Sequence, residues 1–524
     1  MTTSNKTIAK NTAFLYIRMA LIMLISLFTS RVVLDVLGTS DYGLYNVVGG
    51  VVAMMGFLNG SISAGTSRFI TYELGIGDLN RLRNVFNVTL VSHIVIALIV
   101  FIIAETVGLW FVNTQMTFTE DRTVAVNIVY QLSVVTAMLQ LTQMPYTADI
   151  IAHEKMSIYA YVSILEVILR LAMVISLMYI HNVDLLIAYS IMIFFTHLIV
   201  LIIYRCYCTK KYEESHWRFV RNVKQYKAIF SFAGWDIIGG LCVITQGQGI
   251  NILLNIYFGP VINAARAISY QVQGAFTQFT SNFMTAVNPV IVKSYARKEY
   301  DTMIRLINNA SLYSFFLLLV FMMPVLFKIE VLFNIWLKEI PDDTVCFTVI
   351  ILVLTMIRAI ARPIIVATHA TGNIKTLNLY AGILGLFPLP ISWVVVHYGA
   401  SAVVVFWVIF LWGIFANVAE IIILKMRLPK FSILNHFYKV YVRCLIVSIV
   451  SVIICFCLNK MFNNTFWEFC IYYASAFALS CVVVFYIGLT KELRAQIEKK
   501  IKYEIYKINQ WDRNAKNNDG YIHM

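Results

Sequence analysis

Long, uninterrupted apolar runs follow one another along this chain of 524 residues. Each run has about 20 residues or more, enough for a helix to cross about 30 Å of hydrocarbon. The runs do not alternate between apolar and polar residues, so they predict helices and not a β-barrel. With 60% hydrophobic and 13% charged residues, the composition also lies outside the range of soluble proteins. The sequence predicts an all-α integral membrane protein with about 14 transmembrane helices, at 11–37, 43–65, 86–112, 123–148, 157–180, 183–205, 227–255, 260–290, 306–328, 344–370, 375–397, 400–425, 438–459 and 466–489.

The distribution of Lys and Arg predicts how these spans are oriented. If the N-terminus is cytoplasmic, 31 of the 41 Lys and Arg residues fall in inner segments, four in outer loops and six within spans. Inner loops of membrane proteins carry such an excess, and one missed span would invert every later loop. We therefore expect cytoplasmic N and C termini. The net charge of +14 follows mostly from this bias, so it predicts contact with membrane lipids and no nucleic-acid partner.

The chain also matches itself at an offset of about 220 residues. Two homologous bundles of six to seven helices in one membrane chain are typical of alternating access, in which one half rocks against the other. The matching positions are Leu37-Gly38 with Phe258-Gly259, the turn 78–80 and Asn87 with the turn 299–301 and Asn308, and Pro145 and Ala152 with Pro363 and Ala370. The predicted units are an N-terminal bundle (1–205), a cytoplasmic linker (206–226), a C-terminal bundle (227–430), two extra spans (431–490), and an amphipathic helix with a polar tail (491–524).

Catalytic chemistry has no visible basis in this sequence. No loop is long enough to form a soluble catalytic domain, and no GxxxxGK[ST] motif is present, so direct use of ATP is not expected. The nine cysteines lie mostly in or beside spans and lack CxxC spacing, which favours small buried hydrophobes over a metal site. We expect a transporter that is not an enzyme and has no cofactor or metal.

Six arginines lie within the predicted spans, where each costs about 2.5–3.5 kcal/mol at mid-helix. They are Arg18, Arg31, Arg170, Arg266, Arg358 and Arg362. Arg31 with Asp35, and Glu166 with Arg170, stand at i,i+4 spacing, so each pair either neutralises itself or serves a site. Arg18 and Arg266 have no acid at helical spacing on their own spans, and Asp236 lies at a depth that suits Arg18.

The tenth predicted span carries two arginines on one face. Arg358 and Arg362 are four residues apart, and His369 falls close to the same stripe. Because that span holds no acid, we expect the two guanidiniums to face an anion or a water-filled cavity. The alternative is that Arg362 extends toward the inner headgroups.

Uncharged polar residues are unusually frequent in three predicted spans: amides in the seventh and eighth, and glycines and serines with Asn59 in the second. Part of this enrichment is ordinary helix packing, but its extent predicts a wet cavity suited to sugars, with clustered arginines suited to phosphate. The candidate sugar contacts are Asn59, Gln246, Gln248, Asn251, Gln271 and Gln278. Asp236 and Glu105 are the candidates for coupling to a proton or sodium gradient.

The pattern of spans, the stretch LGTSDYGLYN at 37–46 and the Pro145/Pro363 repeat resemble the Wzx-type O-antigen and capsule flippases. These belong to the multidrug/oligosaccharidyl-lipid/polysaccharide (MOP) exporter superfamily. The resemblance implies a multi-pass protein of the bacterial inner membrane that moves an undecaprenyl-diphosphate-linked oligosaccharide to the periplasmic leaflet through a cationic cavity. It also implies partners among polysaccharide polymerases and assembly proteins.

The related lipid II flippases use arginines from their first, second and eighth spans. Arg18, Arg68 and Arg266 occupy comparable places here, although Arg68 lies at the inner end of its span. The lipid II flippases carry two further spans that this chain lacks, which argues against lipid II as the substrate.

Two other functions are weighed against this one. A MATE-like, ion-coupled exporter of small molecules would use the same fold, but the arginine-rich spans disfavour a cationic cargo. A polysaccharide polymerase or ligase needs a sizeable outer loop, and the longest predicted here is about fifteen residues (329–343).

Overall fold

The computed structural model describes the chain over 10–22, 56–115, 120–179, 183–337, 340–373, 375–463 and 465–490, with single residues elsewhere at 25, 29, 32, 33, 36, 37, 41, 45, 493–495 and 498. Within these ranges every regular element is helical. The predicted amphipathic helix of the tail lies almost wholly outside the described residues.

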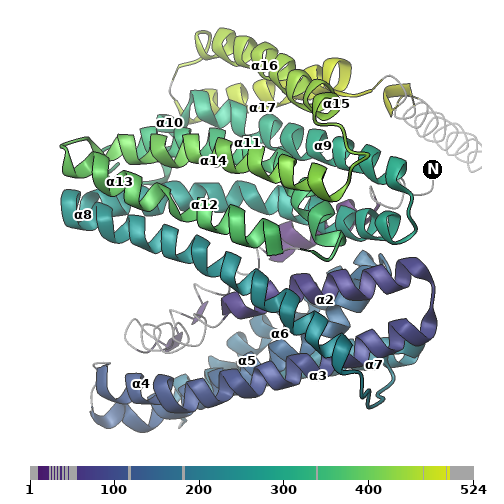
Figure 1. The fold of residues 1–524 in the computed structure, drawn as a ribbon. Helices are drawn as coiled ribbons and strands as arrows, with labels where there is room; N and C mark the ends of the chain where they lie inside the picture. The colour runs from purple at the N-terminus through teal and green to yellow at the C-terminus, as the bar shows by residue number, and fades with distance from the viewer. Residues whose placement is uncertain are drawn as a thin grey trace, which may run out of the picture.

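The N-terminal half holds a helix at 10–22 and the helices α2 to α7, which lie together in the lower part of Figure 1. They are α2 (Gly56–Ile76), α3 (Leu79–Ile103), α4 (Leu109–Gln115), α5 (Thr123–Ala152), α6 (Met156–Leu177) and α7 (Leu185–Lys211). Shorter elements are the π-helix η1 (Ala104–Gly108) and the 3-10 helices η2 (Glu120–Arg122) and η3 (Glu213–Ser215).

The C-terminal half begins with the long α8 (Val223–Ala296) and forms the upper part of Figure 1. It continues through α9 (Tyr300–Phe327), α10 (Ile329–Trp336), α11 (Thr344–Ala370), η4 (Leu377–Ala381), α12 (Gly382–Leu386), α13 (Pro388–His397) and α14 (Ala402–Arg427). The last elements are α15 (Ile433–His436), η5 (Phe437–Val442), α16 (Arg443–Asn459), α17 (Phe466–Val483) and η6 (Val484–Gly488).

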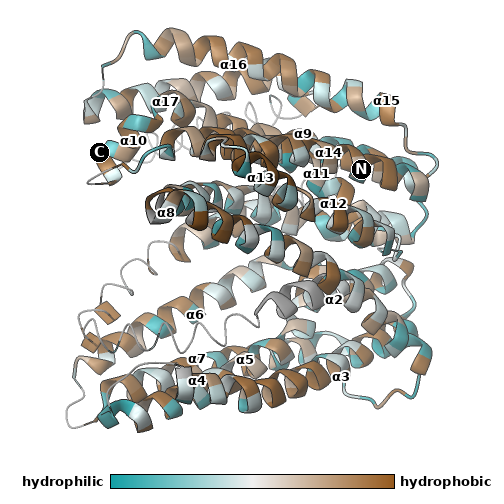
Figure 2. Cartoon of the chain, turned by 60° about the vertical axis from the view of Figure 1, so that its left-hand side comes forward, coloured by the Kyte–Doolittle hydropathy of each residue, from teal (hydrophilic) through white to brown (hydrophobic). Residues whose placement is uncertain are grey.

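The prediction of an all-helical membrane protein is confirmed. Eleven helical segments of the described chain are long and apolar enough to cross a membrane. Of the predicted spans outside that set, 11–37 and 43–65 lie partly outside the described residues, and 260–290 is the part of α8 after Gly259. Hydrophobic residues run along much of each helix, and hydrophilic residues gather near the helix ends (Figure 2).

The predicted seventh and eighth spans are two arms of the single helix α8. The break is at Gly259, whose φ of 79° and ψ of −173° are not helical. A residue with a side chain would be strained at this φ, whereas glycine is not. The glycine therefore allows the two arms to change direction within one element.

The internal repeat is visible in the turns of the backbone. Gly77 (φ 84°) precedes α3 and Lys298 (φ 61°) precedes α9, at equivalent positions of the two halves. Glu154 (φ 60°) and Gly372 (φ 78°) likewise follow the two proline-containing helices, α5 and α11. Left-handed turns are uncommon outside glycine, so their recurrence at the same offsets supports the sequence repeat.

A pair of repeat-related asparagines binds the segment that leaves each bundle. Asn87 in α3 donates to the His216 carbonyl at 3.2 Å and accepts from the Arg218 backbone N–H at 2.8 Å. Asn308 in α9 contacts His436 at the start of α15, with 2.6 Å between Oδ1 and Nδ1. In each half, a buried asparagine at the equivalent position therefore holds the segment that leaves the bundle.

The largest hydrophobic core lies around α9, which packs against α11, α16 and α17. Phe316, Leu319 and Met322 of α9 are buried there with Tyr472 of α17. The two extra C-terminal spans therefore cover a face of the C-terminal bundle and lie away from the N-terminal half (Figure 1).

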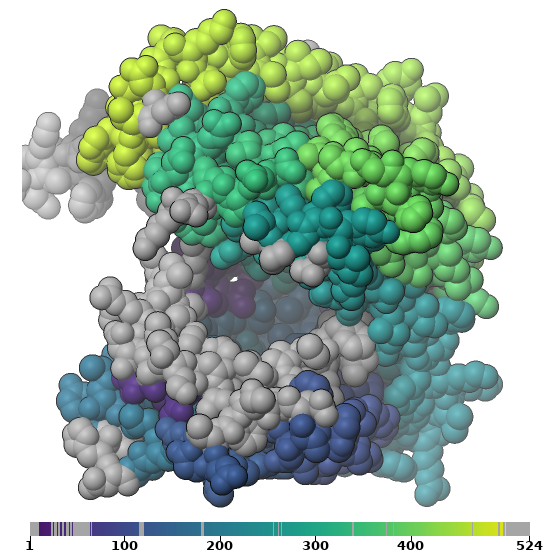
Figure 3. Space-filling model, turned by 90° about the vertical axis from the view of Figure 1, so that its left-hand side faces the viewer, coloured from purple at the N-terminus to yellow at the C-terminus, as the bar shows by residue number. Residues whose placement is uncertain are grey.

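The two halves meet at one end, here named the inner end because its charge predicts that it is cytoplasmic. Lys293 Nζ of α8 lies 2.7 Å from Glu154 Oε1 of the α5–α6 turn. Near them, Arg297 Nε donates to the Gly75 carbonyl at 3.2 Å. Viewed from the opposite, outer end, the molecule is hollowed between its halves (Figure 3). The protein is therefore closed at the inner end and open at the outer end.

Candidate functional site

The surfaces that face each other between the halves come from the two least apolar spans. The helix α2 and the second arm of α8 (260–296) are repeat-equivalent, and both are less apolar than the candidate spans. The α2 helix packs against both arms of α8, with Phe69 on Phe232 of the first arm and Tyr72 near Tyr295 of the second. Along that second arm of α8, Val261 is exposed near its start, and the exposed positions that follow are Ala267, Gln271, Gly274, Ala275, Gln278 and Ser281. These recur at three- and four-residue spacing on one helix face. A polar exposed stripe on a membrane helix is expected to face water, as the hollow of Figure 3 provides.

The predicted sugar contacts fall in three places. Gln271 and Gln278 are both exposed on this stripe, and Gln248 is exposed on the first arm of α8. Gln246 lines a separate cavity inside the C-terminal half, described below. The side chain of Asn59 lies outside the described residues.

Arg18 lies on the first helix at 10–22 and packs on an aromatic ring. Its guanidinium carbon is 4.6 Å from the centroid of the Tyr159 ring, and Nη2 donates to the Tyr159 hydroxyl at 3.3 Å. Stacking of this kind leaves the edge of the guanidinium free to donate further hydrogen bonds. Arg31, predicted on the same span, lies outside the described residues.

Arg68 of α2 lies between the halves near the inner end. Its Nη2 donates to the Ala370 carbonyl of α11 at 3.2 Å, and its guanidinium packs over Phe69 and Tyr72. The Nε atom is buried and has no hydrogen-bond partner. Arg68 therefore joins the halves and keeps unused donor capacity.

Arg266 connects the two arms of α8. Its Nη1 donates to Asn251 Oδ1 at 3.3 Å, and its Nη2 donates to the Gly247 carbonyl at 3.0 Å. The guanidinium also lies 4.6 Å from the centroid of the Tyr270 ring. Asn251, predicted to contact sugar, is thus a partner of Arg266.

Arg362 of α11 is exposed, and among the described residues it has neither a hydrogen bond nor an ion pair. It lies eight residues before the end of α11, which is about 12 Å at 1.5 Å per residue. An unpaired guanidinium at this depth is costly unless it faces water or an anion. Of the predicted cationic residues, Arg362 is the one most available to a ligand.

The arginines of this region have no carboxylate in direct contact, although Glu166, Glu73 and Glu420 lie near enough to interact electrostatically with Arg18, Arg68 and Arg362, respectively. In the described part of the chain, no carboxylate lies within 4.0 Å of the guanidiniums of Arg18, Arg68, Arg266 or Arg362. Arg170 differs, because it pairs with Glu166 at 3.6 Å as the sequence spacing predicts. The cleft between the halves is therefore electrostatically suited to an anion.

A second polar space lies within the C-terminal half, between both arms of α8, α11, η4 to α13, and α14. This cavity has a volume of about 590 Å³ and is lined by Gln246, Gln273, Arg358, Glu420 and Asn378, among others. Arg358 donates from Nη1 and Nη2 to the two carboxylate oxygens of Glu420, at 3.0 and 2.9 Å. The expectation that Arg358 needs an outside anion therefore changes, because a neighbouring helix supplies a carboxylate.

Asp236 lines the same cavity. Asn378 of the π-helix η4 donates to Asp236 Oδ1 at 3.3 Å, and His369 Nε2 lies 4.0 Å from that oxygen. The suggestion that Asp236 serves Arg18 was wrong, because its partners here are on η4 and α11 while Arg18 binds Tyr159. π-Helical turns are frequent at functional sites, and η4 places Asn378 against Asp236.

Glu105, the other candidate for ion coupling, lies in the N-terminal half. It is on the π-helix η1, where Gln131 Nε2 of α5 donates to its Oε2 at 3.0 Å. Its Oε1 is buried without a hydrogen-bond partner. The two candidate acids are therefore in different halves.

Glu420 and Asn378 are site residues that the sequence did not single out. Glu420 is 62 residues from Arg358, and no periodicity links positions on separate helices. The one available sequence signal was that Glu420 is an acid in an otherwise apolar span, and few other positions of the chain have this property.

Comparison with known proteins places the fold. No protein-family model matches the chain, and no curated protein matches it significantly. Solved structures do match the chain. The outward-facing structure of a multidrug-resistance MATE family transporter of the MOP superfamily superposes with a TM-score of 0.68 at 15% identity, covering 82% of this chain and 97% of that one.

Two further structures agree. The MATE transporter VcmN of Vibrio cholerae in its bent form gives a TM-score of 0.66 at 15% identity, covering 84% of this chain and 100% of that one. A MOP-superfamily transporter from Pyrococcus furiosus Vc1, described with a binding pocket of reversed polarity, gives 0.65 at 14% identity, covering 81% and 96%. This multi-pass membrane protein has a MATE-like fold.

Proposed function

We propose that this protein is a flippase for a lipid-linked oligosaccharide of the bacterial inner membrane. Its substrate is an undecaprenyl-diphosphate-linked repeat unit, moved from the cytoplasmic to the periplasmic leaflet by alternating access. The transported unit serves the assembly of O-antigen, capsule or exopolysaccharide. Polysaccharide polymerases and assembly proteins are the partners that would receive it.

The observation that carries this proposal is a set of arginines, on helices of both halves, that no carboxylate contacts directly. Arg18, Arg68, Arg266 and Arg362 have no carboxylate partner within the described chain. Guanidinium groups bind phosphate oxygens through paired N–H donors. The diphosphate and the glycan are the polar parts of this substrate, which cannot cross hydrocarbon unaided, and these cations would replace the hydration of the diphosphate.

The polar stripe on α8 supports the same substrate. Gln271 and Gln278 expose amides seven residues apart, about 10.5 Å along the helix. Amides both donate and accept hydrogen bonds, as sugar hydroxyls require. The glycan would lie along this stripe while the polyprenyl chain stays in lipid.

A second candidate is an ion-coupled exporter of small molecules. It is favoured by Asp236, His369 and Glu420, which bring titratable groups into one cavity of the C-terminal half. The fold it would require is that of the MATE transporters superposed above. Under the leading proposal, Asp236 and Glu105 are instead the acids that couple flipping to a proton or sodium gradient.

The experiment that separates the two functions is a mass-spectrometric profile of undecaprenyl-diphosphate glycans in cells depleted of the protein. Accumulation of one complete repeat unit, with loss of surface polymer, would support flipping and identify the substrate. An unchanged lipid profile, in cells without similar exporters, would favour small-molecule export.

A further inference from the structure

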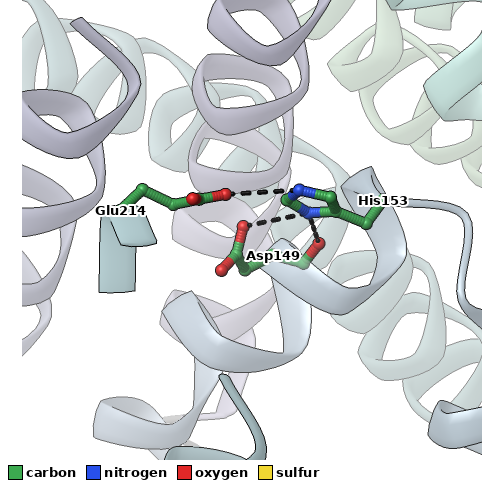
Figure 4. A group of neighbouring side chains, drawn as sticks. All are labelled: Asp149, His153 and Glu214. Carbon is green, nitrogen blue, oxygen red and sulfur yellow. Dashed lines mark hydrogen bonds and ion pairs between the residues drawn. The ribbon is translucent and has the colours of Figure 1, made fainter. Parts of the chain in front are cut away.

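A histidine and two carboxylates from separate segments meet at the inner end of the N-terminal half (Figure 4). Asp149 lies in the last turn of α5, His153 follows that helix, and Glu214 belongs to η3 in the linker between the halves. One ligand atom from each residue can be chosen so that all three lie within 4.8 Å of one another. The linker is thereby brought against the end of α5.

The carboxylates are buried and short of hydrogen bonds. The Asp149 side chain is fully buried and that of Glu214 is 4% exposed. Both Asp149 side-chain oxygens and Glu214 Oε1 lack a well-formed hydrogen bond, and their nearest polar neighbours are the two nitrogens of His153, with Nδ1 3.4 Å from Asp149 Oδ1. Buried carboxylates in this condition need a positive species beside them.

The two nitrogens of the His153 ring indicate where a positive species would bind. The Nδ1 atom lies 3.0 Å from the Asp149 carbonyl oxygen, and since a carbonyl can only accept, Nδ1 carries the proton. The other nitrogen, Nε2, then faces Glu214 Oε1 at 3.3 Å. Without a cation between these two atoms, the lone pair of Nε2 would face a lone pair of Glu214 Oε1, which is repulsive. The ring is also held by stacking on Tyr212, with centroids 4.0 Å apart and planes at 16°.

We propose that Asp149, His153 and Glu214 bind a divalent transition-metal ion at this position. The ligands are His153 Nε2 and one carboxylate oxygen each from Asp149 and Glu214, with water completing the coordination. One imidazole with two carboxylates suits Zn²⁺, Mn²⁺ and related ions better than Mg²⁺ or Ca²⁺. The bond from Nδ1–H to a backbone carbonyl is the contact that commonly orients a metal-binding histidine.

The surroundings attract positive charge. The two carboxylates lie on either side of the His153 ring, with Asp149 Oδ1 3.4 Å from Nδ1 and Glu214 Oε1 3.3 Å from Nε2. The field that favours a proton on the ring also favours a metal ion. A proton is therefore the competing occupant that the experiment must distinguish.

Occupancy of this cluster would affect the contact between the halves. Residue 154 directly follows His153, and its carboxylate pairs with Lys293 of the C-terminal half. An ion bound by both α5 and the linker would fix the turn that presents Glu154. This inference does not depend on which substrate the protein carries.

The test is metal binding by the purified, tag-free full-length protein in detergent after treatment with EDTA. Zn²⁺ and Mn²⁺ are titrated separately, and bound metal is measured by equilibrium dialysis with elemental analysis. Asp149→Asn, His153→Gln and Glu214→Gln are compared with Glu213→Gln and His216→Gln, which alter exposed residues next to the site. Monodispersity on gel filtration and the helical circular dichroism signal show that each variant is folded.

We expect about one ion per chain, with affinity weakened at least about tenfold in each of the three ligand variants and unchanged in both controls. Bound Zn²⁺ should also slow hydrogen exchange at 212–216 in the parent protein and not in His153→Gln. Absence of stoichiometric binding would overturn the proposal and leave a protonated histidine as the occupant. Equal binding by ligand and control variants would also overturn it, because the ions would then be on the surface.

Discussion

Glu154 and Lys293 form an ion pair of 2.7 Å that joins the two halves of the protein at the inner end. Glu154 is presented by the turn between α5 and α6, in a left-handed conformation (φ 60°). Lys293 belongs to the last turn of α8. Both residues must separate if the protein opens toward the cytoplasm.

Breaking this pair should favour opening at the inner end. The side chains are 22% and 17% exposed, so the pair is expected to contribute about 1 kcal/mol, a roughly fivefold change in populations. Lys293→Gln should therefore lengthen the distance between spin labels placed across the inner ends of α2 and α8. The exchange Glu154→Lys with Lys293→Glu should restore the shorter distance. An unchanged distance between the spin labels in Lys293→Gln would show that this ion pair does not stabilise the closed end.

The ion pair between Arg358 and Glu420 should behave asymmetrically. Glu420 is 5% exposed and Arg358 is 33% exposed. Arg358→Gln leaves a buried carboxylate alone and should lower the free energy of unfolding by about 3 kcal/mol. Glu420→Gln should cost less, because water in the cavity can solvate Arg358. The double variant should be more stable than Arg358→Gln, as judged by denaturant unfolding in detergent; equal stability would argue against the pairing.

Arg362 should matter to transport more than to stability. It has no partner among the described residues, so Arg362→Gln should leave the unfolding midpoint unchanged. Loss of one charge-assisted contact to phosphate would cost about 1.5–3 kcal/mol, or roughly 10- to 100-fold in transport. Arg362→Lys should retain part of the activity, and Arg81→Gln, at an exposed inner turn, should retain all of it. Full rescue of depleted cells by Arg362→Gln would remove this residue from the site.

Arg122 holds three segments together at the outer end of the N-terminal half. It contacts Asp41 and Asp184 at 2.5 Å each, and Asp184 also caps α7. Arg122→Gln should lower stability at neutral pH by about 1 kcal/mol, since the three side chains are partly exposed.

The pH dependence of this variant follows from Asp41. Burial raises the pKa of Asp41 above its usual value, while Arg122 opposes that rise. A carboxyl whose pKa is raised by folding stabilises the folded state at low pH and loses that effect as pH rises through the folded pKa. Without Arg122 the pKa of Asp41 in the folded state is raised further. The loss of stability in Arg122→Gln should therefore become smaller as the pH is lowered from 7 to 5. A defect of constant size across thermal melts in that range would contradict this.

The spans and the repeat could be predicted from sequence because they rest on local signals. Hydropathy marks the helices, and the matching turns at 78–80 and 299–301 mark equivalent points at the start of α3 and α9 in the two halves. The ion pair between Glu166 and Arg170 was also predictable, since i,i+4 neighbours lie on one face of a helix.

The partners of Arg358 and Asp236 could not be predicted in the same way. Glu420 reaches Arg358 from α14, and Asn378 reaches Asp236 from η4. Helical periodicity relates residues on one helix and carries no information about which helices pack together. The π-helical turn that presents Asn378 has no clear sequence signature either.

The most direct measurement is flipping by the purified protein in proteoliposomes. The lipid-linked oligosaccharide that accumulates in depleted cells is incorporated, and its exposure on the outer leaflet is followed with a membrane-impermeant glycan-oxidising reagent. We predict that the parent protein makes the inner-leaflet pool accessible, that Arg362→Gln does so roughly 10- to 100-fold more slowly, and that protein-free liposomes do not do so. Accessibility no greater than in protein-free liposomes, from protein that is folded and inserted, would contradict the proposed function.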